Sequence, residues 1–138
     1  MTGTVVVDSS AIIAILRDEP ERAVIQSVLD RSANSVCSLV TFVESFMVVT
    51  GRNLGTLPSD HLELISSLGI SLAPLDPSQA NFAAQAFLQY GKGRHSAKLN
   101  LGDCFSYALA KSLNAPLLYK GSDFSHTDIV SAAAGARP

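Results

Sequence analysis

Apolar residues along this chain fall into two kinds of segment, and the two kinds alternate. Short runs rich in Val, Ile and Leu have the length of buried strands, and longer segments space their apolar residues as one helix face does. The expected strands are Thr4–Val7, Ser35–Ser38, Ile70–Leu75 and Pro116–Tyr119, with a last short strand at Ile129–Val130. The expected helices are Ala11–Arg17, Pro20 to about Arg31, Ser38 or Thr41 to about Arg52, Pro58–Leu68, Pro77–Tyr90 and Leu101–Leu113. The alternation predicts an α/β fold with a mostly parallel central sheet and helices on both faces.

Polar residues mark the boundaries of these elements. Asp8–Ser10 offers caps for the first helix, and Asp76 precedes a proline that suits the first turn of another. Asn53–Gly55 is expected to end the third helix. Two segments are expected to be loops: Gly91–Leu99, which is basic, and Gly121–Asp128, which is polar.

Composition narrows the class of protein. The 138 residues are the size of one domain, expected to span residues 1–138, and 47% of them are hydrophobic. A net charge of −2 argues against gripping nucleic acid by bulk charge, although a local basic stretch can still bind it. Cys37 and Cys104 are expected to be buried thiols of a reducing compartment. The sequence has no signal peptide and no stretch as apolar as a membrane span, so we expect a soluble, cytoplasmic protein.

Four acidic residues lie where apolar stretches end or helices begin: Asp8, Glu44, Asp103 and Asp123. A carboxylate beside core-forming residues needs a partner, because burying it unpaired is very unfavourable. No Lys or Arg adjoins the first three of them in the sequence. The simplest joint partner is a hard divalent cation, Mg²⁺ or Mn²⁺, which prefers oxygen ligands. The pattern therefore favours a metal-dependent enzyme.

The predicted fold can bring these four acids together. In an open parallel sheet the site lies beyond the carboxyl ends of the strands. Asp8 and Asp123 follow strands directly, and Glu44 and Asp103 lie near the starts of helices that can point at the same crevice. We therefore expect the acids to converge in space although they are far apart in the sequence.

At these residues the chain resembles the PIN-domain ribonucleases, and among them the VapC-type toxins of toxin–antitoxin pairs. The segments that carry the resemblance occur in family order and span nearly the whole chain: Val5–Ala11, Thr41–Glu44, Gly91–His95, Leu99–Ala110 and Leu117–Ile129. The first two are weak signals alone, whereas the Asn100–Ala110 and Lys120–Ile129 blocks at this separation are specific. Ser122 is a mild departure, since the family often has Asn or Thr there.

The resemblance implies a three-layer α/β/α sandwich, a Mg²⁺ or Mn²⁺ site, endonucleolytic cleavage of RNA and a small antitoxin that blocks the site. Asp8, Glu44, Asp103 and Asp123 occupy the family's acidic positions, and Ser10 occupies its hydroxyl position. We expect Asp8 and Asp103 to contact the metal directly, and Glu44 and Asp123 to complete the site directly or through water. Ser10 is expected to steady a carboxylate or a metal-bound water. Asp128 is a second late acid that can support the site.

Each candidate also has a simpler interpretation. Asp8 can be a helix cap, Asp103 a first-turn acid that favours the helix dipole, and Asp123 and Asp128 turn formers. Lys92 and Arg94 in the basic loop are candidates for phosphate contact with RNA, but such residues are usually just solvated.

Two other functions and two interactions are considered. A receiver-type phosphoacceptor also places acids and a Lys at strand ends, with Lys120 in that role, but it needs a paired acid where Ser9 stands. A catalytically silent binding module does not explain four acids whose mutual repulsion destabilises the fold. An antitoxin could insert a cation among the acids and lay a helix along Ala11–Arg17 and Val40–Val49. A homodimer is also expected, because small domains this apolar often pair.

Overall fold

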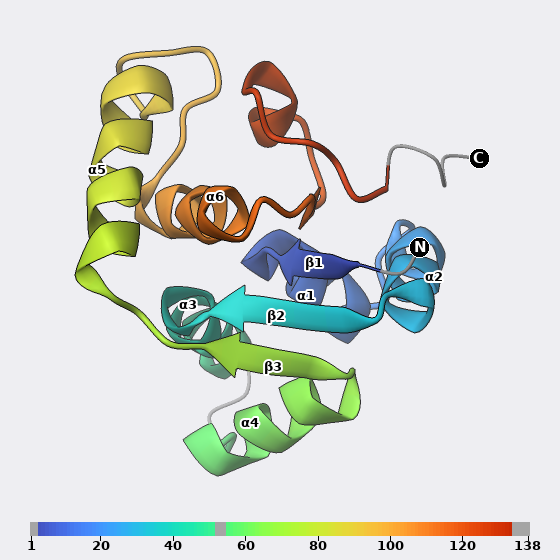
Figure 1. Cartoon of the computed structure of the whole chain (residues 1–138). Helices are drawn as coiled ribbons and strands as arrows, with labels where there is room; N and C mark the ends of the chain where they lie inside the picture. The colour runs from blue at the N-terminus through green and yellow to red at the C-terminus, as the bar shows by residue number, and fades with distance from the viewer. Residues whose placement is uncertain (1–2, 52–54, 134–138) are drawn as a thin grey trace.

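The computed structural model describes residues 3–51 and 55–133 (Figure 1). Its strands are β1 (Thr4–Val7), β2 (Asn34–Ser38), β3 (Ile70–Ala73) and β4 (Leu117–Leu118). Its helices are α1 (Ser9–Leu16), α2 (Arg22–Arg31), α3 (Leu39–Thr50), α4 (Pro58–Ser67), α5 (Pro77–Tyr90) and α6 (Leu101–Leu113), with a 3₁₀ turn η1 at Asp123–His126.

The strands form one sheet in the order β3-β2-β1-β4, and every neighbouring pair is parallel. Parallel neighbours require crossover connections, which the helices between the strands supply. The prediction of a parallel α/β sheet is confirmed. The sheet also brings the ends of β1 and β4 together, since the Asp8 amide donates to the Leu118 carbonyl at 3.0 Å.

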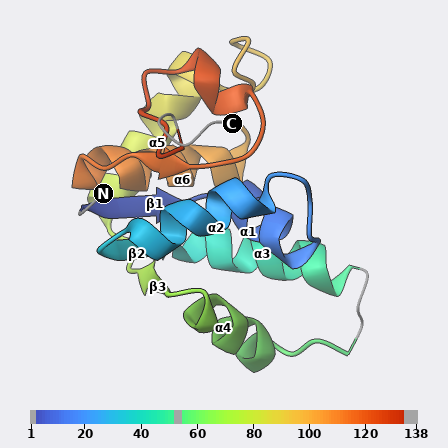
Figure 2. The same cartoon turned by 90° about the vertical axis from the view of Figure 1, so that its right-hand side faces the viewer.

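Alternating side chains of β1 divide the core into two layers. Val5 and Val7 pack on one face with residues of α1, α2 and α4, and Val6 packs on the other with residues of α5 and α6. Figure 2 shows the sheet between these two groups of helices. The expected three-layer α/β/α sandwich is therefore confirmed, and β1 is buried on both sides, as its unbroken apolar run predicts.

Most element boundaries lie within two residues of the prediction, and the differences have local causes. α1 begins at Ser9 because the Asp8 side chain caps it. α2 begins at Arg22, after a tight turn in which Asp18 adopts a φ of 52°. β3 ends at Ala73 because Pro74 cannot donate to the sheet. The predicted end of the third helix lies outside the described residues.

The strand expected at Ile129–Val130 is wrong. The chain meets β4 in a single bridge between Leu117 and Ser131, with the Leu117 amide bonded to the Val130 carbonyl and the Ala132 amide to the Leu117 carbonyl, each at 2.9 Å. A strand of only two residues, β4, offers no edge for a longer ladder. Both cysteines are buried and free, as expected. No helix in the described residues is long and apolar enough to cross a membrane.

Candidate active site

One pocket of about 380 Å³ brings all four predicted acids together at the carboxyl ends of β1 and β4. We call it the acidic pocket; its lining residues are Asp8, Ser9, Ser10, Ile13, Arg17, Glu19, Glu44, Val48, Asn100, Asp103, Lys120 and Asp123. Each acid comes from a different element: the end of β1, the second turn of α3, the first turn of α6 and the start of η1. The convergence expected from the sequence is therefore present.

Asp8 is the buried acid of the pocket, with only 2% of its surface exposed. Its Oδ2 accepts hydrogen bonds from the Ser10 amide at 3.1 Å and the Ser10 hydroxyl at 2.7 Å. Its Oδ1 accepts one from the Ser106 hydroxyl at 2.6 Å. These three donors offset the loss of solvation. Asp8 is thus both a helix cap and a pocket acid, and its role in metal binding stays a prediction.

Two serines fix the Asp8 carboxylate from opposite sides. The Ser10 hydroxyl also accepts a hydrogen bond from the Lys120 amide at 3.0 Å, which ties α1 to the segment after β4. The Ser106 hydroxyl lies 3.3 Å from the Thr41 hydroxyl in the buried interior. Sequence reasoning identified Ser10 and missed Ser106. The sequence does point to Ser106, because it follows Asp103 by three residues and so lies on the same face of α6.

Glu44 reaches the pocket from α3 and is half-buried. Its Oε1 accepts a hydrogen bond from the Ser9 hydroxyl at 2.6 Å, a contact that the sequence analysis did not identify. Burial raises the pKa of Glu44, the Ser9 hydrogen bond opposes that rise, and the charge of Asp8 adds to it. The carboxylate lies against Gly102 of α6, where an added Cβ would overlap its atoms. Gly102 therefore provides the space that Glu44 occupies.

Asp103 couples electrostatically to the other three acids. It forms a capping box with Asn100, in which the Asn100 amide donates to Asp103 Oδ2 at 3.1 Å and the Asp103 amide to Asn100 Oδ1 at 2.9 Å. Burial raises its pKa from 3.8 to about 7. The Asn100 hydrogen bond opposes this rise, and the charges of Asp8, Glu44 and Asp123 add to it. Asp123 itself is exposed at the pocket mouth.

The acidic pocket has the chemistry of a site for a hard cation. Its donors are carboxylate and hydroxyl oxygens, and its acids repel one another in the absence of positive charge. Within the described ranges, no three Asp, Glu, His or Cys side chains are already arranged around a common metal position. The carboxylates are instead engaged by Ser9, Ser10, Ser106 and Asn100. A carboxylate has about four acceptor sites, so an ion could bind at the sites that these donors leave free.

Two cations, Arg17 and Lys120, also line the pocket, and sequence reasoning did not place them there. The Lys120 ammonium lies 2.9 Å from Glu19 Oε1 and 3.7 Å from Glu21 Oε1. Its hydrogen bond to Glu19 raises the Lys120 pKa and keeps the group charged. In residues 3–51 and 55–133, none of the ion pairs includes any of the four pocket acids. The receiver-type role considered for Lys120 therefore has no acidic partner in the pocket other than Glu19.

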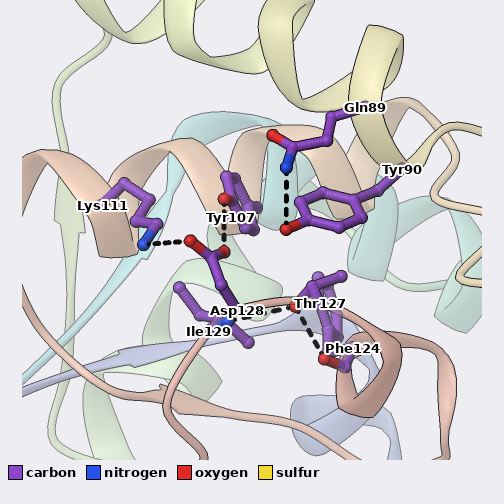
Figure 3. A network of polar contacts seen from close by, with 8 residues as sticks. All are labelled: Gln89, Tyr90, Tyr107, Lys111, Phe124, Thr127, Asp128 and Ile129. Atoms are coloured by element: carbon purple, nitrogen blue, oxygen red, sulfur yellow. Dashed lines mark hydrogen bonds and ion pairs between the residues drawn. The ribbon is translucent and has the colours of Figure 1, made fainter.

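Asp128 lies in a different network, outside the acidic pocket. Figure 3 shows its carboxylate between two residues of α6, where it accepts from the Tyr107 hydroxyl at 2.6 Å and pairs with the Lys111 ammonium at 2.8 Å. Burial tends to raise the pKa of Asp128, but the hydrogen bonds from Lys111 and Tyr107 outweigh it, so the pKa is lowered. Thr127 beside it accepts from the Ile129 amide at 3.2 Å and donates to the Phe124 carbonyl at 2.7 Å. Asp128 fastens the segment that carries Asp123 to α6, and Asp123 is the late acid that lines the pocket.

The basic loop is tied at its base and exposed at its tip. The Leu99 amide bonds to the Tyr90 carbonyl at 3.0 Å and the Lys92 amide to the Leu99 carbonyl at 2.9 Å. The side chains of Lys92 and Arg94 are exposed, and the Arg94 guanidinium lies 5.7 Å from the centre of the Phe87 ring. Neither residue lines the acidic pocket.

A serine and a histidine are in hydrogen-bond contact elsewhere, but they do not form a catalytic pair. Ser45 Oγ lies 2.8 Å from His61 Nε2, and both residues are fully buried. The His61 ring packs against Phe42 and Phe46. No substrate can reach this contact, so it joins α3 to α4 as part of the core.

The sequence matches the PIN domain family over residues 5–130. The chain belongs to the PIN-domain family. Among its relatives is Ribonuclease VapC42 of Mycobacterium tuberculosis, 42% identical over 125 residues that cover 90% of this chain and 95% of the relative.

Solved structures with low sequence identity to this PIN-domain chain have a similar fold. One is M. tuberculosis VapC20, described as a sarcin–ricin loop cleaving toxin, with a TM-score of 0.72, 13% identity, and coverage of 91% of this chain and 96% of that one. Another is a toxin–antitoxin complex from Klebsiella pneumoniae, with a TM-score of 0.67, 17% identity, and coverage of 93% and 97%.

The raised pKa of Asp103 predicts a pH dependence of stability in metal-free protein. Between about pH 4 and pH 7 the folded state keeps a proton on Asp103 that the unfolded chain has lost, so this stability is present below that window and is lost as the pH rises through it. In EDTA, the Tm of the wild type should fall relative to that of Asp103→Asn between pH 5 and 7, and the two should run parallel above pH 8. Groups that do not interact with Asp103 cancel in this difference, whereas the three acids coupled to it are part of the effect. Curves that stay parallel over the whole range would contradict the coupling.

Proposed function

We propose that this PIN-domain chain is a metal-dependent endoribonuclease that acts as the toxin of a toxin–antitoxin pair. The observation that carries the proposal is the convergence of Asp8, Glu44, Asp103 and Asp123 in one pocket at the carboxyl ends of the strands. Its relatives at about 40% identity are named ribonucleases. The proposal includes a cytoplasmic location, where the RNA of the cell would be the substrate.

The pocket residues suit Mg²⁺ or Mn²⁺, with Asp8 and Asp103 as direct ligands and Glu44 and Asp123 completing the site directly or through water. A bound divalent ion would supply charge neutralisation at the scissile phosphate and a water activated for attack. Ser10 and Ser106 hold the Asp8 carboxylate in one orientation. Ser9 holds Glu44, and Gly102 leaves room for it. Asp123, which is exposed at the pocket mouth, would help to orient the attacking water.

An antitoxin partner is supported by apolar surface next to the pocket. Leu39, Val43 and Met47 of α3 are exposed, and with Leu101 they line a groove of about 650 Å³ that also reaches Glu44. α1 contributes less than the sequence suggested, because Ala11, Ile12, Ala14 and Ile15 are buried in the core. A partner helix in this groove could direct an Arg or Lys at the acids.

A homodimer would use a second apolar groove, of about 700 Å³, between α5 and α6, where Phe87 and Leu88 are exposed. Co-expression with any small protein encoded beside this chain, followed by purification and light scattering, tests both interactions. We expect a stable complex that does not cleave RNA. A neighbour that neither binds nor inhibits would refute the toxin–antitoxin proposal and leave the nuclease proposal standing.

Removing a ligand charge should abolish cleavage and leave the fold intact. Asp8→Asn and Asp103→Asn are each expected to lower RNA cleavage by more than about 100-fold, because mutations beyond the ligand shell already cost about 10- to 100-fold. Asp103→Asn should be at least as stable as the wild type without metal, since one repelling charge is gone. RNA cleavage, Mn²⁺ calorimetry and circular dichroism measure these effects.

Asp76→Asn is the matched control, since Asp76 also caps a helix but does not line the pocket. Full cleavage by both site variants at limiting metal would rule out the four-acid site.

Filling the space at Gly102 should displace Glu44. Gly102→Ala is expected to weaken Mn²⁺ binding and cleavage about 10-fold or more, because the new Cβ would overlap the Glu44 carboxylate. Stability should change by no more than about 1 kcal/mol, since Ala favours a helix over Gly by that amount. In the control Gly51→Ala, the only described atoms that the added methyl would meet are the Met47 and Val48 carbonyl oxygens, at 3.4 and 3.5 Å. Equal Mn²⁺ affinity in wild type and Gly102→Ala would show that Glu44 takes no part.

We also propose that Lys92 and Arg94 contact RNA phosphates. Replacing both by Ala should weaken RNA binding and lower the slope of log K against log salt by about 0.7 for each phosphate that the loop no longer neutralises. The double variant Arg22→Ala/Arg31→Ala removes the same charge from α2 and serves as the control. An unchanged slope in the loop variant would show that this loop does not touch phosphate.

A further inference from the structure

The acidic pocket contains a lysine that does not pair with the acids proposed to bind the metal. Lys120 lines the same pocket as Asp8, Glu44, Asp103 and Asp123, yet its ammonium contacts Glu19 at 2.9 Å and Glu21 at 3.7 Å. Glu19 lies in the turn between α1 and α2, and Glu21 is the residue directly before α2. The positive charge is therefore drawn toward one rim of the pocket.

The main chain of Lys120 is fixed close to Asp8. Its amide donates to the Ser10 hydroxyl at 3.0 Å, and that hydroxyl donates to Asp8 Oδ2 at 2.7 Å. A lysine side chain is a flexible stem with a point charge at its end, so from this anchor it has more than one carboxylate within reach. Glu19 and the pocket acids therefore compete for the Lys120 ammonium.

The stability of the protein does not account for this arrangement. The side chains of Lys120 and Glu19 are 34% and 24% exposed, and ion pairs with this much solvent contact contribute little to folding. The position of the charge matters more than the strength of the pair. An ammonium bound to the pocket carboxylates would neutralise them and occupy the oxygen atoms that a divalent cation needs.

We propose that Glu19, assisted by Glu21, is a positioning residue that holds the Lys120 ammonium away from the metal-binding carboxylates, at the pocket rim where it meets a phosphate of the RNA. This inference rests on the proposed function, because it assumes a divalent ion among the four acids. It adds a separate role for the turn between α1 and α2. Arg17 and Lys120 together give the lining of the pocket two cations, which offset the repulsion between the acids and an incoming phosphodiester.

A double-mutant cycle read by Mn²⁺ calorimetry, without RNA, tests the positioning role. The proteins are wild type, Glu19→Gln, Lys120→Ala and the double variant. Glu19→Gln should weaken Mn²⁺ binding about threefold to fivefold when Lys120 is present, the range that a partly exposed ion pair can supply, because the released ammonium then competes for the carboxylates. In the Lys120→Ala background the same change should have little effect. Any long-range effect of the Glu19 charge is equal in both backgrounds and cancels.

Asp18→Asn is the matched control for the loss of a carboxylate. Asp18 belongs to the same turn, pairs with Arg22 at 3.4 Å, lies outside the acidic pocket, and has a φ of 52° that Asn tolerates. It should leave Mn²⁺ affinity unchanged. Equal effects of Glu19→Gln in both backgrounds would overturn the positioning role while the metal site stands. A wild type that binds no Mn²⁺ would overturn the metal site and this inference together.

The phosphate contact has its own readout in the kinetics of RNA cleavage. Lys120→Ala should raise KM for an RNA oligonucleotide about threefold to tenfold with a smaller change in kcat, because the contact is made in the ground state as well as in the transition state. Arg22→Ala is the control, since Arg22 also pairs with an acid, Asp18, but lies outside the pocket. An unchanged KM in a cleaving enzyme would overturn the contact, whereas absence of cleavage by the wild type would instead count against the proposed function.

Discussion

The candidate site depends on a carboxylate buried at the end of a central strand. Asp8 follows β1, which is covered on both faces, and only 2% of its surface reaches solvent. A charge in that position is tolerated because Ser10 and Ser106 supply three hydrogen bonds to it. These contacts join α1 and α6 to the end of β1, and Ser10 joins them further to the segment after β4. The geometry of the pocket thus follows from the hydrogen bonds that the buried Asp8 carboxylate requires.

Without a bound cation, the carboxylates around Asp8 repel one another. Burial and three neighbouring charges raise the pKa of Asp103 to about 7, and burial raises that of Glu44. This repulsion occurs in the pocket that we propose as the active site. Carboxyl groups with strongly shifted pKa values are common in active sites. Lys120 is directed to Glu19 and Glu21, so under the proposed function a metal relieves the repulsion among the acids.

The fold and most of the site could be predicted from the order of residues, because their signals are local. Three buried valines before Asp8, the Asn100–Asp103 capping box and Pro74 each specify a boundary within a few residues. The alternation of strands and helices then implies a parallel sheet, and a parallel sheet implies where acids at strand ends must meet. Asp8, Glu44, Asp103 and Asp123 were placed in this way, whereas Ser10 was identified from the resemblance to the PIN-domain ribonucleases. The strand at Ile129–Val130 was not, because pairing there depends on the length of its neighbour β4.

By itself the sequence determined the layers of the sandwich and the identity of the four pocket acids, since hydrophobic period and capping residues act over one or two helical turns. Only the tertiary structure decided which polar groups serve those acids. Ser9 contacts Glu44 across 35 residues, Ser106 contacts Asp8 across 98, and Lys120 contacts Glu19 across 101. It also assigned Asp128 to Tyr107 and Lys111 and not to the pocket. Hydrogen bonds and ion pairs act over a few ångströms, so their partners are settled only when distant segments are packed together.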